Sequence, residues 1–103
     1  MNGAIVIIQA NGHTTIRTLD RTPDLDDLQA AVGGSIQLVP LFERYYGKPC
    51  AVFCDEEGKL KGLPVNVRAT REWYRAMGVT SADDVLCGAV AIVTGDRALL
   101  EAL

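Results

Sequence analysis

Residues 4–9 read AIVIIQ, and this stretch decides the fold of the chain. Its first five residues are all apolar, and four of them are β-branched. An unbroken apolar run of this length is typical of a central strand that is buried on both faces. Residues 85–94, VLCGAVAIVT, have the same character near the other end of the chain. We therefore predict two buried strands, with Gly88 as a candidate bulge in the second.

A turn follows the first stretch directly. Asn11 and Gly12 form a dipeptide that favours a tight hairpin turn. Residues 14–19 then alternate in part, with Ile16 and Arg17 on opposite faces of a second strand. The two strands are predicted to form a hairpin.

Two helices are predicted from their capping residues. The first opens with Thr22 or Asp24 as its N-cap and ends at Gly33-Gly34, one of which is expected to have a positive φ. The second begins at Asn66, a favourable N-cap, and continues to about residue 77, where Gly78 ends it. Residues 98–103 can form a short terminal helix.

The remaining apolar stretches predict further strands. Residues 35–42 and 49–54 are expected to be strands, separated by a polar and aromatic loop over Glu43–Lys48. The order strand, strand, helix, strand, strand, helix, strand predicts a single α+β domain over residues 1–103. We expect a mixed or mainly antiparallel sheet with two helices on one face. The residues expected to be largely buried are Val6, Ile8, Leu28, Ile36, Leu38, Val52 and Val90.

The composition limits the function classes. The chain has 103 residues, 49% of them hydrophobic, and a net charge of −3, which argues against broad nucleic-acid binding. We expect no signal peptide, no membrane span and no membrane partner. Three cysteines, an odd number, are typical of reduced thiols in a reducing compartment. The cytoplasm is therefore the expected location.

No residue pattern indicates catalysis or metal binding. His13 is the single histidine, and it lies beside the hairpin turn, where histidines are usually solvated. Cys50 and Cys54 are expected on one strand face about 13 Å apart, too far to share a metal ion. Residues 55–57, DEE, are expected to be a solvated turn, and a hydrolase that uses them is the least favoured alternative. We expect no catalytic residues, no metal, no cofactor and no enzymatic activity.

The second predicted helix carries the most informative polar pattern. Arg68, Arg71 and Arg75 are spaced so that they form one basic stripe. One interpretation is a solvated helix face with ion pairs, in which Glu72 takes part. The other is an anion-binding face, supported by the helix N-terminus and by aromatic rings in nearby loops. In that interpretation the residues that contact the ligand are Arg68, Arg71, Asn66, Lys61, Tyr45 and Tyr46.

Several motifs together resemble a family of uncharacterised small domains. The motifs are LQAAVGGSIQ over residues 28–37, DEEGKL over 55–60, GLPVN over 62–66, Ala69-Thr70, and DVLCG over 84–88. They cover nearly the whole chain. The departures from the family pattern are Gln37, Asp55 and Ala89, where the family often has Glu, Asn and an acidic residue.

The resemblance implies a setting in bacteria and their phages, plasmids and other mobile elements, but no established activity. By analogy with other small phage proteins, we expect a non-enzymatic binding protein. The favoured version sequesters a small phosphorylated, nucleotide-like ligand, such as an immune signal. The alternative is an inhibitor or accessory factor that binds a host defence protein through the loop at residues 43–48. Assembly into a homo-oligomer is left open.

Overall fold

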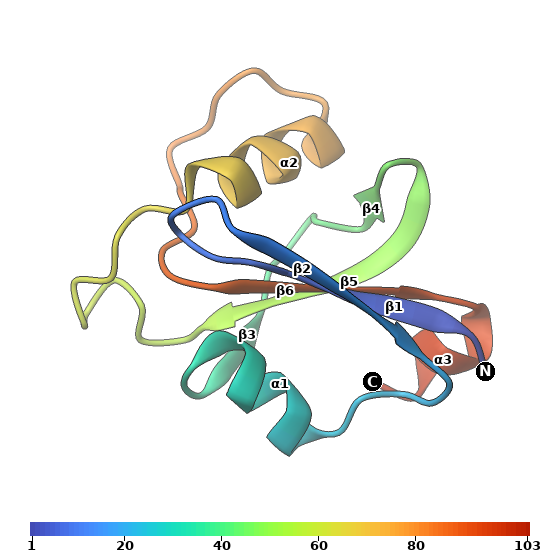
Figure 1. Ribbon diagram of the computed structural model, residues 1–103. Coiled ribbons are helices and arrows are strands. Elements are labelled where there is room, and N and C mark those ends of the chain that lie inside the picture. Colours follow the sequence, from blue (N-terminus) through green and yellow to red (C-terminus); the bar gives the residue numbers. More distant parts are fainter.

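One antiparallel sheet of six strands forms the centre of the computed structural model, which describes residues 1–103 (Figure 1). Its strand order is β2-β1-β6-β5-β3, and the short β4 pairs with β5. The two stretches expected to be buried strands pair with each other, with Ile5 opposite Val93. The strands are β1 (Gly3–Ile8), β2 (Thr14–Leu19), β3 (Ile36–Leu38), β4 (Arg44–Tyr45), β5 (Lys48–Asp55) and β6 (Val90–Gly95).

The three helices lie on opposite faces of this sheet. Helices α1 (Leu25–Val32) and α3 (Arg97–Glu101) cover one face, and α2 (Val67–Met77) covers the other (Figure 1). The predicted α+β class is confirmed, but the expectation of two helices on one face is wrong. The reason is visible in β6, where Val90 to Thr94 are all buried. A strand that is apolar on both faces needs a layer on each side.

The core is correspondingly divided into two halves. On the α2 side, Trp73 and Ala69 pack against strand residues that include Val6, Val52 and Ile92. On the other side, Leu28 and Val32 of α1 and Leu99 of α3 pack against the alternate strand residues, which are Ile5, Phe53, Ala91 and Val93. Each half buries one side of the same strands, as the period of two in β-structure requires.

The predicted strand over residues 35–42 is shorter than expected. β3 ends at Leu38, whose side chain is 58% exposed rather than buried, while Ile36 is half-buried. Pro40 has no N–H to donate, and Leu41 has a φ of 62°, so the chain turns away from the sheet there.

Part of the predicted loop after this strand is itself a strand. β4 forms a hairpin with β5, and the two turn residues, Tyr46 and Gly47, both have a positive φ. The last strand starts at Val90 instead of residue 85 because the chain bends at Gly88, which has a φ of 79° and lies against the side chain of Leu63. Gly33 has a φ of 80°, which confirms one positive φ in the Gly-Gly pair.

None of the three helices combines the length with the apolar character that crossing a membrane requires.

Candidate functional site

Helix α2 is held in place by a fully buried N-cap, Asn66. Its side-chain oxygen accepts the N–H of Ala69 at 3.0 Å. Its amide nitrogen donates to the carbonyls of Ile8 at 2.8 Å and Gly88 at 2.9 Å. Asn66 was predicted to contact the ligand, but its oxygen and both amide hydrogens already have partners within the protein. The structure therefore places it as an anchor of α2.

Two further buried polar groups of α2 make similar contacts. The hydroxyl oxygen of Thr70 accepts the N–H of Leu86 at 3.0 Å. The indole N–H of Trp73 donates to the carbonyl of Pro40 at 2.8 Å. Because buried hydrogen bonds have directional geometry, these contacts fix both the position and the rotation of the helix.

The outer side of α2 borders a hollow of about 420 Å³ beside the β1–β2 hairpin tip, here called the arginine hollow. Arg75 pairs with Glu72 at 3.4 Å, and Arg68 donates to the carbonyl of Gly12 at 3.4 Å. Arg71 forms no ion pair. Three guanidinium groups thus share the hollow with one carboxylate. The lining residues are Ala10, Asn11, Gly12, Val67, Arg68, Arg71, Glu72 and Arg75.

The two tyrosines predicted to bind the ligand differ in their placement. Their rings meet edge to face with centroids 4.7 Å apart. Tyr45 packs against the core, and burial raises the pKa of its phenol; Tyr46 and Glu72 add smaller increases, and Arg68 opposes them. Tyr45 therefore lies within electrostatic reach of the arginine hollow. Tyr46 is 66% exposed and belongs to the turn.

Lys61 lies elsewhere. Its ammonium group contacts the Oδ2 atom of Asp55 at 2.8 Å, and it borders a second hollow that shares only Ala10 with the arginine hollow. Asp55 is buried instead of solvated, and it also accepts the N–H of Glu57 at 2.9 Å. These two hydrogen bonds lower the pKa of the Asp55 carboxyl. The structure thus brings the arginines together but not Lys61 with them.

The remaining polar candidates are dispersed. No three His, Cys, Asp or Glu side chains are grouped so that they could hold a metal ion. All three cysteines are free and half-buried. Burial raises the pKa of the Cys50 thiol to about 11, and burial also raises that of Cys54.

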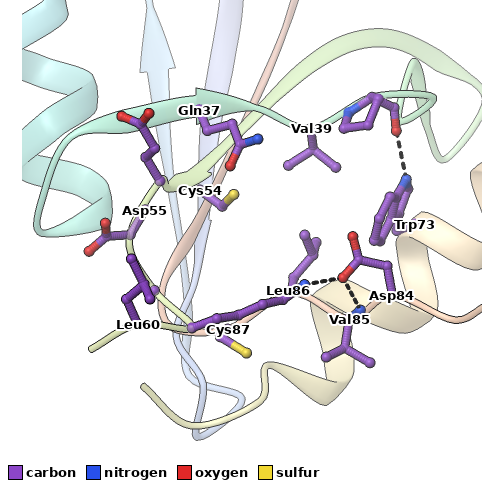
Figure 2. A pocket seen from close by; sticks show the side chains of 14 residues that line it. Gln37, Val39, Cys54, Asp55, Leu60, Trp73, Asp84, Val85, Leu86 and Cys87 are labelled. Carbon is purple, nitrogen blue, oxygen red and sulfur yellow. Dashed lines mark hydrogen bonds and ion pairs between the residues drawn. The ribbon is translucent and has the colours of Figure 1, made fainter. Parts of the chain in front are cut away.

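A pocket of about 180 Å³ lies on the other side of α2, between Trp73 and the strands β3 and β5, and we call it the Trp73 pocket (Figure 2). Sequence reasoning missed it because its walls come from separate parts of the chain. The one available signal was Gln37, a polar residue within an apolar strand. The lining residues are Gln37, Val39, Pro40, Cys54, Asp55, Glu56, Gly58, Lys59, Leu60, Trp73, Asp84, Val85, Leu86 and Cys87.

Comparison with known proteins identifies one related group. The model of a family described as "Domain of unknown function (DUF3846)" matches residues 1–99. No curated protein and no solved structure matches the chain.

Proposed function

The chain belongs to the DUF3846 family of domains of unknown function, and from the arginine hollow we propose that it is a non-enzymatic binding protein for a small anionic ligand. The favoured ligand is phosphorylated and nucleotide-like, and it occupies the arginine hollow. The observation that carries this proposal is the convergence of three arginines on one hollow that holds a single carboxylate.

Phosphate suits this hollow for two reasons. Guanidinium groups donate paired hydrogen bonds that match the geometry of phosphate oxygens. Arg68 also lies in the first turn of α2, where unpaired backbone N–H groups and the helix dipole favour negative charge. Arg71 supplies a cation that no carboxylate of the chain neutralises, so it is available to a ligand.

The size of the hollow and its surroundings support a nucleotide-like ligand. A volume of about 420 Å³ lies within the range of small-molecule sites. Tyr45 does not line the hollow, but its phenol is close enough to Arg68 to be influenced by the arginine charge, and in this proposal a base or ribose that extends beyond the hollow packs against the Tyr45 ring. Together with the mobile-element setting that the motifs imply, this favours sequestration of a nucleotide-derived immune signal in the host cytoplasm.

One observation favours the alternative, an inhibitor or accessory factor that binds a host protein. Leu41 and Tyr46 are 67% and 66% exposed, and both have a positive φ, which is costly for large side chains. A backbone that holds exposed apolar side chains at such a cost is typical of a contact surface. This surface lies on the β3–β5 connection rather than on the arginine hollow.

Native mass spectrometry of protein purified from cells tests the two functions together. Sequestration predicts an additional mass of a small phosphorylated compound, which Arg71→Ala removes and Tyr46→Ala retains. The alternative predicts a bound protein that Tyr46→Ala removes. A chain that carries no small molecule, and that captures a specific protein only with Tyr46 intact, would overturn the proposal.

A further inference from the structure

We propose that the Trp73 pocket is a second binding site, which takes a small, uncharged, planar ring bearing a hydrogen-bond donor beside an acceptor. The inference does not rest on the arginine hollow, which lies on the other side of α2 and has a different chemistry. It rests on the size of the pocket, on its charge balance and on one unpaired amide.

The size of the pocket limits its occupant to about one ring. An apolar cavity of about 150 Å³ holds a benzene molecule, and this pocket measures about 180 Å³. Trp73, Val39 and Leu86 supply aromatic and aliphatic walls, and Figure 2 shows their side chains on the borders of the open space. Such walls stabilise a flat ring by stacking and by burial of apolar area.

Of the charged residues that line the pocket, Lys59, Asp84 and Asp55 are each paired with another charged side chain, and Glu56 is an exposed carboxylate without an ion pair. Lys59 forms an ion pair with Asp84, so the lysine side chain links the loop that follows β5 to the loop that precedes β6 on one side of the pocket. Asp55 is neutralised by Lys61. No free cation faces the pocket, so it offers a phosphate group no compensating charge. An uncharged ligand avoids the cost of desolvating an ion there.

Gln37 is the polar group left available. Its side chain forms no hydrogen bond within the protein, and Figure 2 shows its carboxamide on the border of the pocket. The indole N–H of Trp73, by contrast, already donates to Pro40. A carboxamide offers one acceptor and two donors. It therefore pairs with an amide edge in a ring, such as that of uracil, or with a ring-bound carboxamide, as in nicotinamide.

Fluorescence measures occupancy directly because Trp73 is the only tryptophan of the chain. Titration with uracil, thymine and nicotinamide is expected to give a saturable change in emission for at least one of them. Inorganic phosphate is expected to give none. Excitation at the red edge of the tryptophan band limits interference from absorption by the ring itself.

Two matched variants test the role of the amide. Gln37→Leu is expected to weaken ring binding ~5-fold, the value of about one neutral hydrogen bond. Gln29→Leu, on α1 across the sheet, is the control and should bind like the parent. Arg71→Ala should also leave ring binding unchanged, which separates this site from the proposed function. The absence of a saturable response to all three rings, or equal affinity in the parent and Gln37→Leu, would overturn the inference.

Discussion

Helices α1 and α2 are attached to the same sheet by different means. α1 contributes Leu28 and Val32 to an apolar layer, and its N-cap Asp24 is exposed. α2 contributes Trp73 to the opposite layer, but it is also tied down by the buried polar groups of Asn66 and Thr70. Apolar packing has no directional requirement, whereas hydrogen bonds have one.

This difference between the two helices indicates which side of the sheet carries the candidate sites. The α1 side of the sheet is covered by the apolar packing of Leu28 and Val32, and the hollow at the end of α1 holds the paired Lys61 and Asp55 but no arginine. The α2 side has the arginine hollow on one flank of the helix and the Trp73 pocket on the other. A helix whose rotation is fixed by directed bonds can present two different surfaces reliably. On α2, Asn66 and Thr70 should therefore contribute to stability and Arg71 to ligand contacts, whereas Trp73 belongs both to the core and to the wall of the Trp73 pocket.

The largest expected effect is at the N-caps, where the two helices differ most. Asn66→Ala removes the cap and also the two buried hydrogen bonds to the carbonyls of Ile8 and Gly88, so it should lower the free energy of unfolding by about 4 kcal/mol. Asp24→Ala at the exposed cap of α1 should cost about 1 kcal/mol. Chemical denaturation of both variants measures this, and equal costs would remove the distinction between the helices.

A second prediction tests the apolar attachment of α1. Leu28 is buried beneath the helix, so Leu28→Ala should cost about 3 kcal/mol through lost burial and a residual cavity. Leu38→Ala makes the same change at an exposed strand residue and should cost less than about 1 kcal/mol. Thermal unfolding of the two variants gives the comparison. A small cost at Leu28 would show that α1 is not held by packing.

A third, smaller effect concerns pH. The pKa of Asp55 lies below its ordinary value of 3.8 in the folded state, because Lys61 and the Glu57 N–H stabilise the carboxylate. The carboxylate contributes its full stabilisation when the pH is above the ordinary pKa, and the contribution is lost as the pH falls through the lower pKa of the folded state. Asp55→Asn should therefore be less stable than the parent at neutral pH. Acidification below about pH 4 should reduce the difference in the free energy of unfolding between the two proteins.

The control for this prediction is Asp26→Asn on α1, whose carboxylate forms no hydrogen bond or ion pair, so stability at neutral pH should change little. Chemical denaturation of the three proteins across the acidic range gives the measurement. A difference between the parent and Asp55→Asn that does not change with pH would show that the carboxylate is not the source of the stabilisation.

The sequence predicted those features that depend on local pattern. The apolar runs identified β1 and β6, and Asn66 and Gly78 were recognised as the ends of α2 because capping preferences are local. The placement of α2 on the other face was not predicted, although β6 is apolar on both sides. The burial of Asn66 was not predicted either, because its amide group donates to the carbonyl of Ile8, which is 58 residues away in sequence.

The candidate sites show the same limit. Helical spacing predicted the stripe of Arg68, Arg71 and Arg75, and they do share one hollow. Lys61 was grouped with them because it precedes the helix, yet its partner Asp55 holds it in a different part of the surface. Side-chain direction in an irregular loop depends on tertiary partners that periodicity does not describe. The walls of the Trp73 pocket likewise come from segments that only folding brings together.

The central claim is that Arg71, the arginine of α2 that forms no ion pair or hydrogen bond within the protein, serves a ligand and not the fold. Calorimetric titration of the parent, Arg71→Ala and Lys61→Ala with nucleoside diphosphates and cyclic nucleotide-like compounds tests it most directly. We predict saturable binding that Arg71→Ala weakens about tenfold or more, the value of one charge-assisted contact, with unfolding changed by less than about 0.5 kcal/mol. Lys61→Ala should bind like the parent. No binding of any phosphorylated compound, or equal affinity in the parent and Arg71→Ala, would contradict the claim.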